Sequence, residues 1–127
     1  MKAKLKGINA ERELVKFFWT KGWGAVRIAG SGAARLPATD IIAGNGKRIL
    51  VIECKAASKF LISLEQAQRL QHLASRLGAE SWFGFKIARK KWYFVKPGEL
   101  KQKGNFLFCN VNYVVKAGID LDQLISL

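Results

Sequence analysis

The sequence predicts an α/β fold in which a mixed sheet of about five strands is flanked by helices. Residues 38–55 have the pattern of an antiparallel hairpin around Asn45-Gly46, the dipeptide most typical of a two-residue turn. Residues 47–88 then alternate strand, helix and strand, the pattern of a right-handed parallel crossover. Because one chain contains both kinds of pairing, the sheet should be mixed.

The remaining elements follow in order along the chain. They are a helix over 8–21, a strand over 25–29, a glycine-bearing loop over 30–37, a helix over 64–77, strands over 80–88 and 91–96, a short edge strand within 105–115 and a terminal helix over 120–127. Neither a repeat nor an interdomain linker interrupts them, so one domain spanning 1–127 is expected.

The two long helices show which side chains should face the core. In the first helix, Glu11 lies in one apolar stripe with Leu14, Val15 and Phe18, so an acid is predicted to point inward. The second helix has Leu70, Leu73, Ala74 and Leu77 as its apolar stripe. Its first residues fit a capping box, which leaves open whether Gln66 closes that box or faces a site one turn before Leu70.

Composition limits the classes of function. The chain has 127 residues, half of them apolar, which is enough for a hydrophobic core. Its 22 Lys and Arg against 9 Asp and Glu give a net charge of +13, which indicates a polyanionic partner. No helix combines a basic face with a continuous apolar one, so nucleic acid is favoured over a membrane surface. Without a signal peptide or a membrane-spanning run, a cytoplasmic protein is expected.

The hairpin concentrates charged side chains on one face. With a two-residue turn, Asp40 lies opposite Val51 and diagonal to Glu53, at about 7–8 Å between Cα atoms. Glu53 and Lys55 share that face because side chains alternate along a strand, whereas Cys54 points to the other face as a buried thiol. Half-burying two carboxylates is costly unless a cation compensates, and a divalent metal would do so.

These residues carry a resemblance to a known family. Asp40 followed by Glu53-Cys54-Lys55 resembles the PD-(D/E)xK nuclease superfamily, and within it the chain resembles archaeal-type Holliday junction resolvases. The matching segments are Gly7-Ile8-Asn9-Ala10-Glu11-Arg12, Arg27-Ile28-Ala29-Gly30-Ser31-Gly32, the hairpin strand from Asp40, and Ile52-Glu53-Cys54-Lys55. One departure is that Thr39, not proline, precedes Asp40, since the proline is at position 37.

The resemblance implies a restriction-endonuclease-like fold and a homodimeric, Mg²⁺-dependent endonuclease in which Mn²⁺ substitutes. Such enzymes bind four-way DNA junctions and nick two opposing strands symmetrically. The implied metal ligands are Asp40, Glu53, the Cys54 carbonyl and, through water or at a second site, Glu11. Lys55 would act on the attacking water and Ser31 on a phosphate. The implied DNA-binding residues are Lys4, Lys6, Arg12, Arg27, Ser31 and Arg35.

Structural alternatives accompany each of these roles. Glu11 can be an acid that stabilises a helix start. Ser31 can be an ordinary loop serine, the arginines can be plain surface bases, and Lys55 can be solvated. Trp23, Trp82, Trp92 and Phe94 can stack on bases, although core positions are favoured, and His72 is predicted to be solvated. For the whole chain, the alternatives are a related nuclease acting in restriction or repair and a basic DNA-binding protein that does not cut.

Overall fold

The computed structural model describes residues 2–29, 36–55, 59–87 and 91–127, without the side chains of residues 2–6 and 59–60. Five strands form the main sheet in the order β1-β2-β3-β5-β6, with β3 and β5 parallel and the other neighbours antiparallel. These strands are β1 (Gly24–Arg27), β2 (Ile41–Gly44), β3 (Ile49–Lys55), β5 (Glu80–Lys86) and β6 (Trp92–Val95). The predicted mixed sheet of five strands is therefore confirmed.

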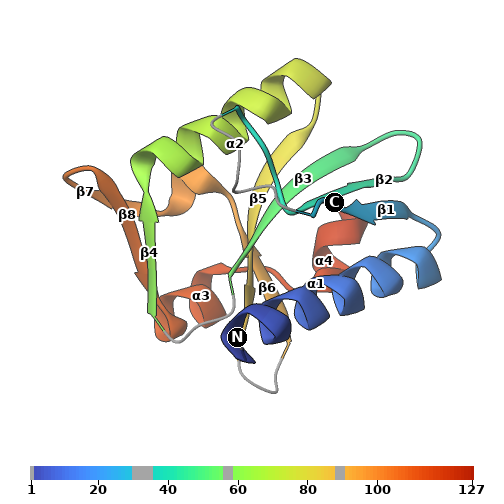
Figure 1. Ribbon diagram of the computed structural model, residues 1–127, viewed down its shortest axis with the longest axis horizontal. Helices are drawn as coiled ribbons and strands as arrows, with labels where there is room; N and C mark the ends of the chain where they lie inside the picture. The colour runs from blue at the N-terminus through green and yellow to red at the C-terminus, as the bar shows by residue number, and fades with distance from the viewer. Residues whose placement is uncertain (1, 30–35, 56–58, 88–90) are drawn as a thin grey trace.

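Helices cover both faces of this sheet (Figure 1). On one face lie α1 (Lys2–Thr20) and α4 (Leu121–Ser126), and on the other lie α2 (Leu64–Leu77) and α3 (Val111–Ala117). The strands supply both cores because their side chains alternate: Leu50 and Ile52 pack toward α1, whereas Val51 packs toward α2. Glu53 and Lys55 continue the α2 side of β3, past the point where the apolar residues end.

A second sheet, which the sequence did not predict, lies beside α2 (Figure 1). It consists of β4 (Lys59–Ser63), β8 (Phe106–Asn110) and β7 (Lys101–Lys103) in the order β4-β8-β7, with a 3-10 turn over Pro97–Glu99 before it. The edge strand predicted within 105–115 is correct only for its first half and occupies the centre of this sheet. Asn110 then caps α3, because its side chain accepts a hydrogen bond from the Tyr113 N–H at 2.9 Å.

The predicted two-residue hairpin turn is wrong. Gly44 pairs with Ile49, so residues 45–48 form the loop. The Asn45 side chain closes it by accepting hydrogen bonds from the Lys47 and Arg48 N–H groups at 2.9 and 2.7 Å. Gly46 occupies the left-handed region with φ +92°. The register therefore differs by two residues from the predicted one, which leaves every side chain on its predicted face because the strand period is two.

Two helix predictions also need correction. The first helix begins at Lys2 rather than at residue 8, so Glu11 lies in its middle and not in its first turn. The second helix has the predicted bounds, with Ser63 as N-cap and Gly78 as left-handed C-cap. Leu77 is nevertheless 43% exposed, because the buried residues of α2 are Ala67, Leu70 and Ala74 and the core ends within its last turn.

Candidate active site

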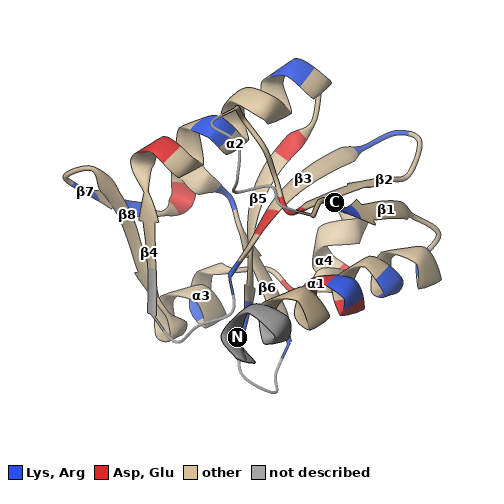
Figure 2. Cartoon of the chain, in the orientation of Figure 1, with Lys and Arg blue, Asp and Glu red and all other residues tan. Residues whose placement is uncertain are grey.

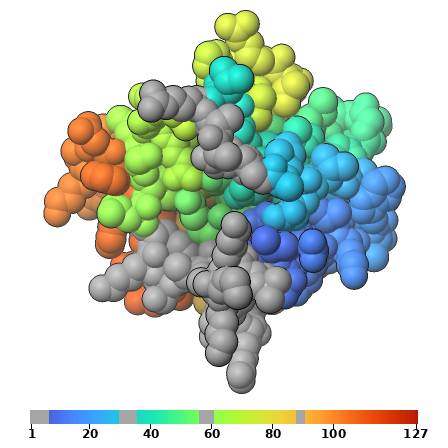
Figure 3. All heavy atoms as spheres, in the orientation of Figure 1, coloured from blue at the N-terminus to red at the C-terminus, as the bar shows by residue number. Residues whose placement is uncertain are grey.

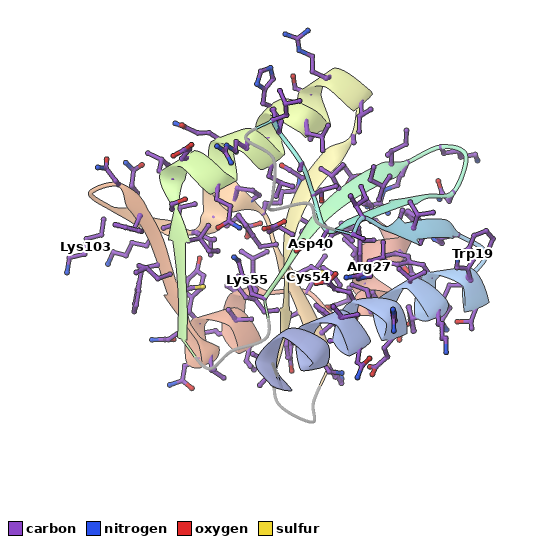
Figure 4. The ribbon with its side chains drawn as sticks, viewed as in Figure 1. Trp19, Arg27, Asp40, Cys54, Lys55 and Lys103 are labelled. Atoms are coloured by element: carbon purple, nitrogen blue, oxygen red, sulfur yellow. The ribbon has the colours of Figure 1, made fainter. Side chains whose placement is uncertain are left out.

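The centre of the site is the pair of carboxylates on neighbouring strands. Asp40 directly precedes β2, and it lies opposite Glu53 when the register in which Ile41 pairs with Ile52 is continued by one residue. The Asp40 N–H donates to the Ile52 carbonyl at 3.2 Å, and the Cys54 N–H donates to Asp40 Oδ2 at 2.8 Å. These bonds hold the Asp40 carboxylate against the end of β3. Figure 4 shows Asp40, Cys54 and Lys55 gathered near the middle of the molecule, between α1 and α2.

Gln66 on α2 connects the second carboxylate with the lysine. Its Nε2 donates to Glu53 Oε2 at 2.5 Å, and its Oε1 accepts from Lys55 Nζ at 3.3 Å. Its backbone N–H donates to Ser63 Oγ at 3.1 Å, which caps the helix. The two alternatives for Gln66 are thus combined, since the backbone serves the cap and the side chain serves the site. Its position one turn before the buried Leu70 was the sequence signal for this orientation.

Glu11 approaches the same site from α1. Arg27 on β1 donates from Nε to Glu11 Oε1 at 3.0 Å, and both side chains are about four-fifths buried, with 21% and 16% of their surface exposed. Burial and the negative charge of Asp40 raise the pKa of Glu11, while Arg27 opposes this rise. Glu11 is therefore close enough to Asp40 for the two carboxyl groups to interact electrostatically. Its mid-helix position excludes the helix-start explanation.

Burial and a neighbouring negative charge disfavour the ionised form of Glu53. Desolvation, followed by the facing Asp40 carboxylate, raises the pKa of Glu53 from 4.5 to about 7, although Lys55 and Gln66 oppose this rise. Two acids held together in a half-buried space favour a proton or a bound cation between them. Cys54 points the other way, as predicted, and packs against the core on the α1 side, where burial raises the pKa of its thiol.

Side chains supply only part of the ligand set that a hard divalent cation needs. Within the described ranges, no three side chains of His, Cys, Asp or Glu lie close enough together to hold a metal ion. Asp40 and Glu53 are the two carboxylates that the structure places face to face. Mg²⁺ typically takes one or two carboxylates and keeps several waters, so such a pair suits it.

A cavity of about 400 Å³ opens onto the carboxylates. Asp40 and Glu53 line it together with Leu36 and Ala38 from the segment before β2, and with Ser63, Glu65, Gln66 and Arg69 at the start of α2. Figure 3 shows this face of the molecule, where the cyan residues before β2 meet the green and yellow residues of α2. A polar cavity with carboxylates at its base can admit a phosphodiester only if cations offset their charge.

The structure describes only some of the other predicted site residues. Ser31 and Arg35 lie outside the described residues, and Lys4 and Lys6 are described only as backbone of α1. Arg12 is exposed on α1 beside Glu11, and Figure 2 shows further Lys and Arg along α1 and α2. His72 is exposed, as predicted. Trp23, Trp82, Trp92 and Phe94 are buried, which excludes them as base-stacking groups.

Comparison with known proteins identifies the class and then the family. A structure of Archaeoglobus fulgidus Hjc, described as a Holliday junction resolvase from an archaeal hyperthermophile, superposes with a TM-score of 0.84 at 31% identity, over 93% of this chain and 97% of that one. The fold is thus that of a junction-resolving nuclease. The family model for the archaeal Holliday junction resolvase (Hjc) matches residues 2–127, and the chain belongs to this family.

Curated relatives agree with this assignment. A protein named crossover junction endodeoxyribonuclease Hjc from Archaeoglobus fulgidus is 40% identical over 93 residues, which cover 72% of this chain and 68% of the relative. A protein of the same name from Sulfolobus acidocaldarius is 34% identical over 131 residues, which cover 98% of this chain and 90% of the relative.

None of the helices in the described part of the chain has the length and apolar character needed to span a membrane.

Proposed function

We infer that this chain is a crossover junction endodeoxyribonuclease, which hydrolyses phosphodiester bonds in four-way DNA junctions. The observation that carries this inference is the arrangement of Asp40 directly opposite Glu53, with Gln66 bonded to both Glu53 and Lys55. A protein that only binds DNA has no use for half-buried carboxylates that repel phosphate. Family membership and the relatives' names support junction DNA as the substrate, in preference to the substrates of restriction or repair nucleases.

Nucleases of this kind are metal-dependent, and we propose Mg²⁺, with Mn²⁺ as a substitute. Asp40, Glu53 and the Cys54 carbonyl would hold the ion, and Glu11 would reach it through water. The raised pKa of Glu53 supports this assignment, because the facing carboxylates need a compensating positive charge. When bound, the ion supplies Lewis-acid stabilisation of the charge on the scissile phosphate and an activated water.

The chain's own residues position the reactants. Lys55 presents its ammonium group to the cavity side of β3, where it orients the attacking water and exchanges protons at Nζ. Gln66 holds both Lys55 and Glu53, so it is a positioning residue for the pair. We propose that Ser31 contacts a phosphate of the DNA. Lys4, Lys6, Arg12, Arg27 and Arg35 are proposed to bind the DNA backbone, with Arg27 also restraining Glu11.

We propose that the active form is a homodimer built from single domains spanning 1–127, because two opposed nicks require two sites. A two-fold dimer presents two equal basic faces to a four-way junction and carries a charge of +26, twice the +13 of one chain. The outer face of the second sheet exposes Leu61, Phe106 and Phe108 side by side, which supports a contact there. We propose that the enzyme works in the cytoplasm, either as an archaeal protein or as a viral protein in the host cell.

The decisive experiment compares three labelled DNAs. Four-way junction, linear duplex and single strand are incubated with the protein, with Mg²⁺ or with EDTA. Paired nicks in the junction alone, only with Mg²⁺, are the expected result. Equal cutting of duplex would indicate another nuclease of the same fold, and junction binding without cutting under any metal would indicate a non-catalytic protein. Binding in EDTA should weaken steeply with salt, since several phosphate contacts are made.

A further inference from the structure

Helix α2 forms one wall of the active-site cavity. This wall carries a positively charged side chain that has no role in the function proposed above. Arg69 lines this cavity together with Asp40 and Glu53. Of the described residues that line it, three are acids (Asp40, Glu53 and Glu65) and Arg69 is the sole cation. Apart from Lys55, which is bonded to Gln66 next to Glu53, a phosphodiester that enters the cavity therefore meets a positive charge among these lining residues only at Arg69.

The helix geometry places Arg69 next to the reacting centre. Gln66 contacts Glu53, and Arg69 follows three residues later on the same face of α2. Three residues correspond to a rise of about 4.5 Å along the helix axis. Arg69 thus lies one turn beyond a residue that touches the proposed metal ligand Glu53.

The present partner of Arg69 is a weak one. Its Nη2 contacts Glu65 Oε1 at 2.9 Å in an i,i+4 ion pair, with the Glu65 side chain 74% exposed and that of Arg69 36% exposed. Such solvated pairs contribute little and exchange readily. Only Nη2 takes part in this ion pair, and a phosphate bound in the fork geometry that arginine prefers would pair with Nη2 and one neighbouring N–H group, in place of Glu65. Glu65 and Arg69 both line the cavity, so this ion pair lies at the cavity wall.

We propose that Arg69 binds the phosphate adjacent to the scissile one and so guides the nicked strand across the carboxylates. This proposal rests on the proposed nuclease function, since it concerns the same cavity. Arg69 would be a binding residue rather than a catalytic one. Its loss should raise KM with little change in kcat, because a phosphate held equally in the ground state and the transition state affects binding alone.

The matched control lies on the same helix. Arg76, two turns further along, is exposed and does not line the cavity. Arg69→Gln and Arg76→Gln remove the same charge, and their unfolding transitions establish that both fold. Junction binding is measured in EDTA by fluorescence anisotropy at several salt concentrations. Arg69→Gln should weaken binding about 5-fold or more and reduce the salt slope by about 1, whereas Arg76→Gln should change affinity less than about 2-fold. Equal losses in the two variants would overturn the proposal.

A chemical version of a double-mutant cycle locates the contact. Single phosphates around the mapped cut are replaced in turn by neutral methylphosphonates. Wild type should lose affinity at the position beside the scissile phosphate, and Arg69→Gln should show no further loss there while it keeps the losses elsewhere. An Arg69→Gln protein that remains sensitive at every position would contradict the contact. If wild type fails to prefer or cut junctions, the proposed function fails, and the comparison of Arg69→Gln with Arg76→Gln on duplex still tests the contact.

Discussion

Asp40 and Glu53 face each other directly across β2 and β3, because the loop between these strands has four residues and Ile41 pairs with Ile52. The Cys54 N–H bonded to Asp40 keeps one carboxylate in place, and Gln66 keeps the other. Two acids are therefore restrained toward each other in a half-buried space before any ligand binds. This preorganised repulsion underlies the first two predictions.

Glu53→Gln should abolish cleavage while junction binding in EDTA stays equal or becomes slightly tighter. Glutamine keeps the shape of glutamate but loses the charge that holds the metal, and removing a negative charge cannot weaken attraction to phosphates. Asp40→Asn should behave in the same way. Cleavage is measured under single-turnover conditions, and affinity by anisotropy. Cutting by Glu53→Gln near the wild-type rate would show that the assigned site is wrong.

The metal-free protein should lose stability as the pH rises, and Glu53 should be one cause. The pKa of Glu53 is about 7 when folded and near 4.5 when unfolded, so the folded state binds its proton more tightly. The destabilisation therefore develops between pH 4.5 and 7 and is complete above that range. In EDTA, Glu53→Gln should raise the free energy of unfolding at pH 8 by up to about 3 kcal/mol relative to its effect at pH 4. Urea unfolding at both pH values measures this.

The control for this experiment is Glu65→Gln, which removes an exposed carboxylate from α2. It should alter the free energy of unfolding by less than about 0.5 kcal/mol at either pH. If Glu53→Gln has the same effect at pH 4 and pH 8, burial and the facing Asp40 carboxylate do not raise the pKa of Glu53 as described above.

Gln66→Leu should reduce kcat by about 10- to 100-fold and leave junction affinity in EDTA unchanged, because both Glu53 and Lys55 lose the group that positions them. Ser63→Ala separates this role from helix capping. It removes the acceptor of the Gln66 N–H and should cost about 1 kcal/mol of stability with little effect on kcat. Equal losses of kcat in the two variants would mean that Gln66 acts only through the helix.

Phe108→Asp should convert the proposed homodimer to a monomer at micromolar concentration and suppress paired nicking, because it places a charge within the exposed face of the second sheet to which we assign the dimer contact. Val115→Asp introduces the same charge at another exposed apolar residue, on α3, and should leave the dimer intact. Analytical ultracentrifugation distinguishes the two. A Phe108→Asp protein that sediments as a dimer would exclude this face.

Gly84→Ala should destabilise the fold by about 1–3 kcal/mol through overpacking. A Cβ at Gly84 would lie 3.0 Å from Phe94 Cε1 and 3.2 Å from Ile52 Cγ2, beside Cys54 in the β3–β5 register. Gly98→Ala meets nothing within 4 Å and should change the free energy of unfolding by less than about 0.5 kcal/mol. Thermal unfolding of both variants tests the difference, and equal stabilities would contradict it.

The sequence by itself determined which side chains share a face. Asp40, Glu53 and Lys55 are on one side of the hairpin in the predicted register and in the observed one, because a shift of two residues preserves the strand period. The ends of α2 could also be predicted from the local sequence, because Ser63 and Gly78 cap the two ends of the helix through bonds to residues within one turn. Patterns of this kind depend on neighbours along the chain and survive errors of register.

Only the tertiary structure decided which groups meet. The pairing of the two strands, in which Ile41 lies opposite Ile52, set Asp40 opposite Glu53 rather than opposite Val51. The bonds of Gln66 required α2 to pack over β3, and the second sheet pairs β4 with β8 across more than forty residues. Leu77 has the spacing of a core residue yet is exposed, whereas Ala74, three residues earlier, is buried. Contacts between segments far apart in sequence have no local signal, so their partners are selected only when the whole chain packs.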